Sequence, residues 1–387
     1  MQRQHLAPAV RDRLKRYPKP YDNHYGVVPL PPTEEPIELG TSRQALTSAI
    51  ESIGRADALA KSYENHFLLS RVLVRQEAVT SSAIEGTYST LDHLLEVEGL
   101  DEDEDNSPEV RQVRSYALAL ERALVQVERN RHDAFSVGLI RDLQREVIKD
   151  DPDFKDSPGE IRERVVWIGG MHIARSIYNP CPPSDIRICL EQQIDYLQCT
   201  GLQQVNQNIV VRMALAHSHF EAIHPFSDGN GRTGRLLLPL MLAADAHTPL
   251  YLAPYLARHR PSYMAALAAA QQRLEYAPLI GVLANAITAT VEMAETAHKD
   301  LFALFMNWNA RRKWRKNSAA KLALDLLPGF PVVTTKTLAS KLNVSPQAAN
   351  ISAQQLVDVG ILTEKTGNKR NRVFVAVEVL EIFNRSP

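Results

Sequence analysis

The chain contains 387 residues, with 44 Lys or Arg against 45 Asp or Glu and a formal net charge of −1. An apolar content of 44% and this even charge balance exclude a disordered or strongly basic chain, and the length allows roughly two to three domains. We find no run of about 18 apolar residues and expect no secretory leader, so the sequence predicts a cytoplasmic protein without a membrane span. The cysteines, Cys181, Cys189 and Cys199, lack metal-type spacing and are expected to be free thiols.

The first part of the chain is predicted to be an extended arm followed by helices. Prolines recur through residues 17–36, which is typical of an arm that lies on the body it precedes. Apolar periodicity then predicts helices over 42–61 and 67–85, and Gly86 is expected to end the second of them. The acidic segment 96–105 is expected to be a solvated loop.

A helical body is predicted downstream of this segment. Apolar periodicity predicts helices over 107–130, 135–149, 184–199, 209–223, 236–244, 251–257, 261–274 and 276–308. Proline and glycine return at 151–183, where residues 165–170 predict a strand that enters a turn. The open edge of such a hairpin could bind a target peptide by strand addition, and a hairpin that only packs is the alternative.

The most concentrated polar chemistry lies in residues 224–235, which read HPFSDGNGRTGR and separate two apolar, helix-like runs. Their glycines let the backbone turn its N–H groups toward one point at the start of the second helix, which makes an anion site. Arg232 and Arg235 lie three apart in the first turn and suit phosphate oxygens, so the pattern indicates a polyphosphate. Asp228 could hold a divalent cation there, and His224 could take a proton from an incoming nucleophile.

The spacing His-x-Phe-x-Asp-Gly-Asn-Gly-Arg-x-x-Arg resembles the signature of the Fic family and matches it without a departure. The resemblance implies a helical fold that transfers AMP from ATP, with Mg²⁺ as cofactor, to a hydroxyl side chain of a protein target. It also implies that His224 is the general base, that Asp228 holds the metal and that Arg235 holds the γ-phosphate. The nucleotide-binding residues that it implies are Gly229, Asn230, Gly231, Arg232, Thr233, Gly234 and Arg235.

A second motif, SSAIEG at 81–86, places Ser81 and Glu85 on one face of a helix that Gly86 ends. A glutamate in a last turn opposes the helix dipole, so we expect an arginine to hold it; a solvated side chain at a frayed end is the alternative. The motif resembles the inhibitory helix of Fic proteins. This resemblance implies that Glu85 pairs with Arg235 and blocks the productive γ-phosphate pose, because an Arg–carboxylate pair competes with an Arg–phosphate pair.

The segment at 165–170 resembles in position the flap that docks the target side chain in Fic proteins. Gly159 and Arg162 match the Gly-x-x-Arg that often precedes this flap. The residues that the resemblance assigns to target docking are Val166, Trp167, Ile168 and Gly169. Tyr255 or Tyr263 could face the adenine, although most tyrosines in such helices belong to the core.

Residues 310–387 are expected to form a separate winged helix-turn-helix domain. Its predicted elements are helices over 318–327, 334–342 and 346–359, and strands at 361–364 and 373–376 that flank a basic turn. The helix that would read DNA is poor in arginine, and the basic residues lie in the turn and in the link at 311–316. This distribution favours loose phosphate contact over base readout, and a protein-docking or dimerising role stays open.

Together these patterns predict a mainly α protein in three parts. Residues 1–106 form the arm and the inhibitory helix, 107–309 form a Fic catalytic domain with a small β-hairpin flap, and 310–387 form the winged helix. The predicted function is an autoinhibited protein adenylyltransferase with ATP and a protein Ser, Thr or Tyr hydroxyl as partners, and with DNA or a second copy as open possibilities. The alternatives are a nucleotide-sensing DNA-binding regulator, a Fic-type enzyme that removes AMP, and one that uses another nucleotide-linked donor.

Overall fold

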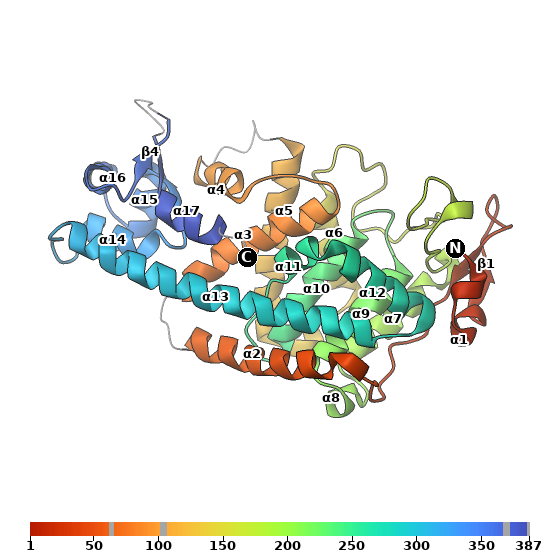
Figure 1. Cartoon of the computed structure of the whole chain (residues 1–387). Helices are drawn as coiled ribbons and strands as arrows, with labels where there is room; N and C mark the ends of the chain where they lie inside the picture. The colour runs from red at the N-terminus through yellow and green to blue at the C-terminus, as the bar shows by residue number, and fades with distance from the viewer. Residues whose placement is uncertain (62–65, 101–106, 367–371, 385–387) are drawn as a thin grey trace.

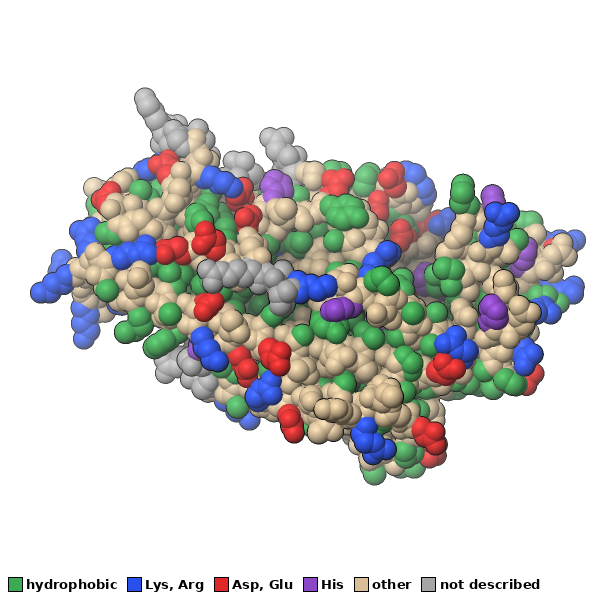
Figure 2. All heavy atoms as spheres, viewed as in Figure 1, with side chains coloured by type: hydrophobic (Ala, Val, Ile, Leu, Met, Phe, Trp, Pro, Cys, Tyr) green, Lys and Arg blue, Asp and Glu red, His purple; other side chains and the backbone are tan. Residues whose placement is uncertain are grey.

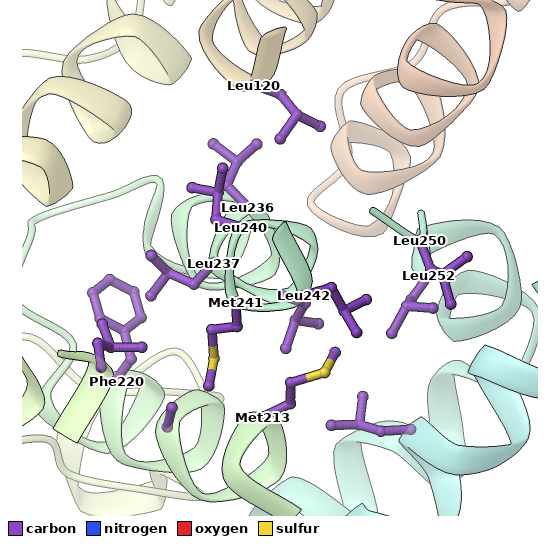
Figure 3. Close-up of a cluster of buried hydrophobic side chains, with 14 of the residues drawn as sticks. Leu120, Met213, Phe220, Leu236, Leu237, Leu240, Met241, Leu242, Leu250 and Leu252 are labelled. Carbon is purple, nitrogen blue, oxygen red and sulfur yellow. The ribbon is translucent and has the colours of Figure 1, made fainter. Parts of the chain in front are cut away.

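Two apolar helices, α9 (Ile209–Ile223) and α10 (Asn230–Ala244), pack side by side within the main body (Figure 1). This computed structural model describes residues 1–61, 66–100, 107–366 and 372–384. Every residue of α9 and all but one of α10 are buried, as expected of helices that are apolar on all sides. The core side chains labelled around them (Figure 3) are Leu120, Met213, Phe220, Leu236, Leu237, Leu240, Met241, Leu242, Leu250 and Leu252.

The other helices of the main body surround this pair. They are α1 (Pro8–Arg11), α2 (Arg43–Lys61), α3 (His66–Ile84), α4 (Leu91–Leu100), α5 (Pro108–Asn130), α6 (Val137–Ile148), α7 (Ile186–Leu197), α8 (Gln203–Asn206), α11 (Ala253–Arg258), α12 (Arg260–Arg273) and α13 (Ala277–Arg311). The side chains of Ser107, Ser136 and Asn208 accept the N–H group three residues later and so begin α5, α6 and α9. The mainly helical fold is confirmed, and the predicted helices lie within a few residues of these bounds.

The longest helix, α13, spans 35 residues and runs from the main body to a smaller C-terminal unit, residues 312–384 (Figure 1). Leu279, Leu283 and Ile287 in its first half are fully buried, and the helix packs against α2, α9 and α12. By length and composition alone α13 is apolar enough to cross a membrane, and 39% of its most apolar window is buried in the fold. Mean hydropathy is a looser criterion than an uninterrupted run of about 18 apolar residues, so the expectation of no membrane span stays a prediction.

The N-terminal arm contains a short hairpin that the sequence did not predict. Strands β1 (Leu14–Arg16) and β2 (Tyr25–Val27) pair antiparallel, with Lys15 opposite Gly26. In contrast, the hairpin predicted at 165–170 is reduced to a single bridge between Ile168 and Tyr178, because the chain turns at once. The Val27 N–H donates to the Asn179 carbonyl at 3.0 Å, so the arm lies against the chain next to Tyr178, the bridge partner of Ile168 in the predicted flap.

The acidic segment predicted to be a loop is helical where the structure describes it. Helix α4 extends to Leu100, and residues 101–106 lie outside the described residues. Leu91 and Leu95 are buried, so apolar packing forms the helix, while Asp92 and Glu96 are half-buried and Glu98 lies in buried ion pairs. The expectation of a solvated loop from residue 96 onward was therefore wrong at its start.

The C-terminal unit combines four helices with a small antiparallel sheet. Its elements are α14 (Ala319–Leu326), β3 (Val332–Thr334), α15 (Thr335–Leu342), α16 (Pro346–Asp358), β4 (Thr363–Glu364), β5 (Val373–Val375) and α17 (Val377–Asn384). The strand order is β3-β5-β4, with Val375 paired to both Val332 and Thr363. The sequence missed the short β3 and α17, and residues 367–371 of the predicted basic turn lie outside the described residues. Lys and Arg side chains gather where α13 turns into α14 (Figure 2), at the basic link.

Two apolar clusters divide the described part of the chain differently from the predicted domain boundaries. The larger cluster joins α2, α3 and α5 to α9, α10 and α13, so no break separates residues before 106 from those after it. The smaller cluster forms the core of the C-terminal unit and also includes Val72, Leu91 and Leu95 of α3 and α4. Helices α3 and α4 therefore contribute to both cores.

Candidate active site

The loop between α9 and α10 is held rigidly by its own side chains. His224 ends α9 in the left-handed conformation, with φ 49° and ψ 63°. Gly229 takes φ 78° immediately before α10, a backbone that glycine adopts without strain. The Asn230 side chain closes the loop, since its Oδ1 accepts from the Phe226 N–H at 2.9 Å and its Nδ2 donates to the Phe226 carbonyl at 2.8 Å. Phe226 itself is fully buried and anchors the loop in the core.

The first turn of α10 forms an anion site. The Thr233 N–H donates to the Gly229 carbonyl at 2.9 Å, and the N–H groups of residues 230–232 before it have no acceptor within the helix. A Cβ atom added at Gly231 would overlap Oε1 of Glu85, so this carboxylate lies directly against the turn. An intramolecular anion thus lies where the sequence predicts a phosphate.

Arg235 holds that carboxylate in place. Its Nη2 donates to Glu85 Oε1 at 2.8 Å and to the Ser81 carbonyl at 3.0 Å, and its Nε donates to Ser81 Oγ at 2.8 Å. The Arg235 side chain is only 2% exposed, whereas that of Glu85 is 39% exposed. Burial is the largest influence and opposes the guanidinium charge, but Glu85, Tyr263 and Tyr116 together raise the pKa of Arg235 above its ordinary value. Gly86, at φ 91°, follows the end of α3 as expected.

The remaining residues of the motif lie in two different surroundings. Asp228 is exposed beside the turn, and its backbone carbonyl accepts from Gln144 Nε2 at 3.0 Å. Arg232 is buried and donates to Gln112 Oε1 of α5 at 3.0 Å, so its guanidinium already has a partner. Thr233 is buried, and its Oγ1 donates to the Gly229 carbonyl at 2.8 Å.

Gly234 has a packing role. A Cβ atom there would lie 2.7 Å from Glu221 Oε1 and 3.1 Å from the Phe220 ring, so the residue lets α9 and α10 approach closely. Thr233 and Gly234 thus contact other protein atoms in the core. These contacts give no support to the nucleotide-binding role predicted for the two residues.

A buried carboxylate that the sequence did not single out lies behind His224. Glu221 Oε2 is 3.7 Å from His224 Nδ1, while Glu221 Oε1 and His224 Nδ1 have no hydrogen-bond partner among the described residues. Burial would raise the pKa of Glu221, but His224, His217 and Arg235 together hold it below its usual range. Glu221 is therefore a charged positioning residue for the imidazole, and only its i,i+3 spacing from His224 could have indicated it.

The two tyrosines considered for the adenine lie in different surroundings. Tyr263 is buried, and its hydroxyl is 2.6 Å from His217 Nε2, so it belongs to the core behind the loop. Tyr255 is half-buried and its ring lies 4.2 Å from that of His259 between centroids. Among the two, only Tyr255 presents a partly exposed ring.

Arg162 ties the flap segment to the end of α9. Its Nε donates to the His224 carbonyl at 2.7 Å, its Nη1 to the Arg164 carbonyl at 2.9 Å and its Nη2 to the Cys181 carbonyl at 2.6 Å. The Arg162 N–H also donates to the Pro225 carbonyl at 3.0 Å. This cation complements the negative end of α9, although burial lowers the pKa of Arg162 to about 10.

Replacing Arg162 with alanine is expected to destabilise the protein by about 3 kcal/mol or more, because several buried carbonyl groups lose a charged donor. Urea unfolding at neutral pH measures the difference. Arg164→Ala is the matched control, since the Arg164 side chain pairs with exposed Asp156 at 3.1 Å and its loss should cost about 0.5 kcal/mol or less. Equal losses of unfolding free energy in the two variants would show that the buried Arg162 contacts contribute no more to stability than an exposed ion pair.

The predicted flap residues lie together next to the N-terminal hairpin. The Trp167 indole N–H donates to the Gly170 carbonyl at 3.2 Å, and its ring lies 5.9 Å from that of Tyr21 between centroids. The Ile168 N–H donates to the Tyr178 carbonyl at 2.9 Å, and Val166 is half-buried. Gly169 turns the chain at φ 70° and leaves the adjacent Met171 89% exposed. The segment offers an exposed apolar surface close to the loop, since Arg162 joins the two.

Glu77, a buried glutamate of α3, was not among the functional residues predicted from the sequence. Glu77 lies two turns before Glu85 and accepts the Ala253 N–H at the start of α11 through Oε2 at 2.8 Å. Burial raises the pKa of Glu77 to about 7, although the Ala253 N–H and Arg235 act in the opposite direction. The ionised form of Glu77 thus opposes the docking of α3.

We expect Glu77→Gln to be more stable than the parent by about 1–3 kcal/mol at pH 8, and equally stable near pH 4.5. The unfolded carboxyl ionises near its ordinary pKa and the folded one near 7, so the parent loses stability as pH rises between these values. Urea unfolding at both pH values measures the effect. Glu128→Gln, at an exposed position on α5, is the control. If the stability difference between Glu77→Gln and the parent is the same at pH 4.5 and pH 8, the raised pKa of Glu77 is contradicted.

Among the described residues, no group of three or more His, Cys, Asp or Glu side chains could hold a metal ion. A magnesium ion that enters with a polyphosphate needs only one or two carboxylates from the protein. The exposed carboxylate of Asp228, beside the anion turn, fits that requirement. The cysteine thiols are free, and the Sγ atoms of Cys181 and Cys189 lie 3.7 Å apart in the core.

Two family models match the chain, in the part of the fold that carries this site. The model described as Fic/DOC family covers residues 134–242, and the model described as Fic/DOC family N-terminal covers residues 43–125. A protein adenylyltransferase Fic of Culex quinquefasciatus is 27% identical over 259 residues, which are 65% of this chain and 47% of that protein. Protein adenylyltransferase fic-1 of Caenorhabditis elegans is 31% identical over 122 residues, 31% of this chain and 22% of that protein. The chain therefore spans about half or less of the length of these curated relatives.

Solved structures share the fold. Fic-1 from C. elegans aligns with a TM-score of 0.53 at 23% identity, over 67% of this chain and 73% of that chain. A Fic family protein from Desulfovibrio desulfuricans G20 aligns with a TM-score of 0.53 at 18% identity, over 88% of this chain and 98% of that chain. Because the complete loop motif lies within the first matched region and the helix before Glu85 lies within the second, this chain belongs to the Fic/DOC family.

Proposed function

We propose that this protein is an adenylyltransferase that moves AMP from ATP to a hydroxyl side chain of a protein target. The observation that carries the proposal is the anion turn of α10, which already holds a carboxylate on Arg235 close to His224. The curated relatives named protein adenylyltransferase support the reaction, although they match only part of their length.

The residues of the loop supply the parts that such a transfer needs. The free N–H groups of α10 and Arg235 bind the phosphates, which fixes the α-phosphorus relative to His224. His224 takes the proton of the target hydroxyl, the hydroxyl oxygen forms a bond to the α-phosphorus, and pyrophosphate leaves with the electrons of the broken bond. Glu221 keeps a negative charge behind the imidazole that receives the proton. Asp228 would hold Mg²⁺, which neutralises phosphate charge when bound.

The same geometry supports an autoinhibited resting state. Glu85 competes with a phosphate for Arg235 and for the turn at Gly231, since both anions need the same guanidinium donors. Ser81 strengthens the competition, because it binds Arg235 through its hydroxyl and its carbonyl. ATP can adopt the productive pose only when the last turn of α3 withdraws.

Mass spectrometry after incubation of the protein with ATP, Mg²⁺ and a cell extract tests the proposal. We expect AMP on Ser, Thr or Tyr side chains of extract proteins or of the chain itself, and loss of this modification when EDTA removes the metal. If a variant that lacks the Glu85 carboxylate still adds no AMP to any protein, the proposed reaction is wrong.

We also propose that the C-terminal unit is a winged helix that makes loose phosphate contacts with DNA. Its order of helix, strand, two helices and two strands supports this interpretation. The exposed side chains of α16 include Gln347, Asn350 and Gln354, which are uncharged, so the basic link would carry the affinity. Electrophoretic shift of a DNA duplex at rising salt concentration tests the proposal. We expect the protein to bind the duplex at the lowest salt concentration and to release it after a small increase. Absence of binding at every salt concentration would refute the proposal.

A further inference from the structure

The helix that carries Glu85 is shared between two parts of the molecule. Its last turns hold Arg235 through Ser81 and Glu85. Its first half instead contacts the C-terminal unit: Arg71 Nη1 donates to the Gly329 carbonyl at 3.1 Å, and Gln76 Nε2 donates to the Phe383 carbonyl at 3.2 Å. The helix therefore connects the nucleotide site to residues near both ends of the C-terminal unit.

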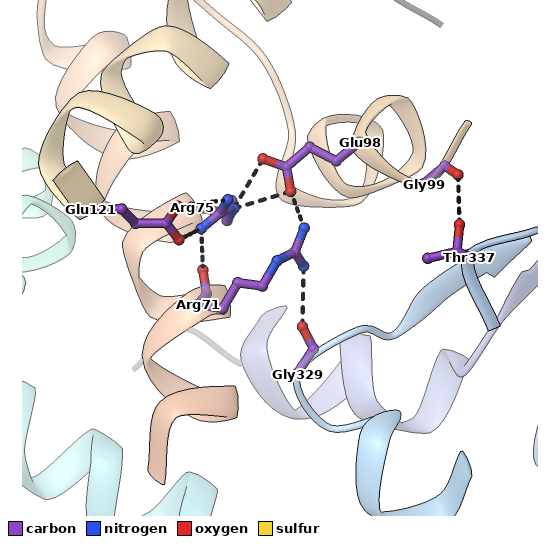
Figure 4. A network of polar contacts seen from close by, with 7 residues as sticks. All are labelled: Arg71, Arg75, Glu98, Gly99, Glu121, Gly329 and Thr337. Carbon is purple, nitrogen blue, oxygen red and sulfur yellow. Dashed lines mark hydrogen bonds and ion pairs between the residues drawn. The ribbon is translucent and has the colours of Figure 1, made fainter. Parts of the chain in front are cut away.

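The neighbouring helix α4 is also built into the C-terminal unit. Leu91 and Leu95 are buried in the apolar cluster of that unit, together with Val72 of α3. The Gly99 carbonyl accepts from Thr337 Oγ1 of α15 at 3.1 Å (Figure 4). A Cβ atom at Gly99 would lie 3.4 Å from the Val332 carbonyl oxygen, so the end of α4 lies close against β3.

Further polar contacts extend this interface along α4. Lys365 pairs with Glu96, and Asn384 Nδ2 donates to Asp92 Oδ1 at 3.0 Å. Each of these contacts is exposed and contributes little by itself. Together with the apolar contacts they place α4 against β3, β5 and the end of α17.

A buried ion-pair network makes α3 and α4 one rigid piece (Figure 4). Arg75 Nε donates to Glu98 Oε1 at 3.0 Å, and the Arg75 guanidinium also pairs with Glu121 of α5. Arg71 pairs with the same Glu98, whose side chain is 6% exposed. Separation of α3 from α4 would leave a buried charge without its partner, which is strongly unfavourable. A displacement of the C-terminal unit therefore acts on α3 through α4 and directly through Arg71.

We propose that the C-terminal unit sets how often Glu85 occupies the nucleotide site, with Arg71 as the residue that couples the two. A displacement of the C-terminal unit away from α3 and α4 separates Glu85 from Arg235, and the γ-phosphate of ATP can then bind Arg235. Linkage makes the coupling reciprocal, so withdrawal of Glu85 also loosens the contacts of the C-terminal unit. The effect on AMP transfer rests on the proposed function, whereas the coupling itself does not.

Hydrogen exchange of the full-length Arg71→Met protein tests the coupling. This change removes the donor to the Gly329 carbonyl but leaves Glu98 paired with Arg75. We expect amides of residues 78–86 to exchange about 5–10-fold faster than in the parent, and AMP transfer to rise by a similar factor. Arg55→Met is the matched control, since Arg55 of α2 pairs with Glu295 at the surface, away from the contacts of α3 with the C-terminal unit, and should change neither measurement.

The reverse direction and a second variant keep the test decisive. Thr337→Val, which removes the bond to the Gly99 carbonyl, should also speed exchange at 78–86, and Glu85→Gly should speed exchange at 71–76 and in β3. Unchanged exchange at 78–86 in both interface variants, with faster exchange confined to their own contacts, would overturn the coupling. If exchange changes as expected but even Glu85→Gly transfers no AMP, the coupling holds and the proposed reaction fails.

Discussion

Replacing Glu85 with glycine is expected to raise the rate of AMP transfer about 10–100-fold. Loss of the carboxylate frees Arg235 and clears the turn at Gly231, so a triphosphate no longer competes with an intramolecular anion. One charge-assisted pair contributes about 1.5–3 kcal/mol, which corresponds to this range of rates if its loss is fully expressed. Initial rates of incorporation of AMP labelled on the α-phosphate measure the effect.

A glycine also weakens the helix it enters, by about 1 kcal/mol relative to alanine, and the control must separate this effect. Ala83→Gly lies on the same last turn of α3 but leaves the Glu85 carboxylate in place. We expect it to raise the rate only slightly. A rate in Ala83→Gly that equals the rate in Glu85→Gly would show that helix fraying, and not the carboxylate, limits the reaction.

Replacing His224 with alanine should lower the transfer rate about 10²–10⁴-fold, because no other side chain of the loop can take the proton of the target hydroxyl. The measurement is best made in the Glu85→Gly background, where the starting rate is high. ATP affinity measured by calorimetry should change by about threefold or less, since in the proposed pose the phosphates contact α10 and Arg235 rather than the imidazole.

His247→Ala serves as the control for loss of an imidazole. His247 follows the far end of α10, a helix of 15 residues that spans about 22 Å, and it pairs with Asp57 at 2.8 Å. Its replacement should leave the transfer rate unchanged. A His224→Ala protein that transfers AMP as fast as its parent would show that the general base has been wrongly assigned.

The central part of the site could be predicted because its signal is local in the sequence. The glycines and arginines of the loop fix a helix N-terminus, and the spacing of Ser81 and Glu85 fixes one face of α3. The pairing of Glu85 with Arg235 joins residues 150 positions apart, and the sequence alone could not supply it without the resemblance to a known family.

The supporting residues could not be predicted, since their roles depend on contacts between distant elements. Nothing in the local pattern shows that Arg162 binds the His224 carbonyl, or that Glu77 accepts the first N–H of α11. The acidic composition obscured α4, whose buried leucines pack against both the main body and the C-terminal unit. Gly234 has a packing role that its place in the motif did not indicate, and its predicted contact with a nucleotide stays a prediction.

The proposed AMP transfer requires a triphosphate that binds the first turn of α10 with its α-phosphorus facing the target. Parallel incubations of Glu85→Gly with ATP labelled on the α-phosphate and ATP labelled on the γ-phosphate test this most directly. We expect protein-bound label from the α-labelled nucleotide and none from the γ-labelled one, because the γ-phosphate leaves in pyrophosphate. Protein-bound label from the γ-phosphate, or none from either nucleotide, would contradict the account.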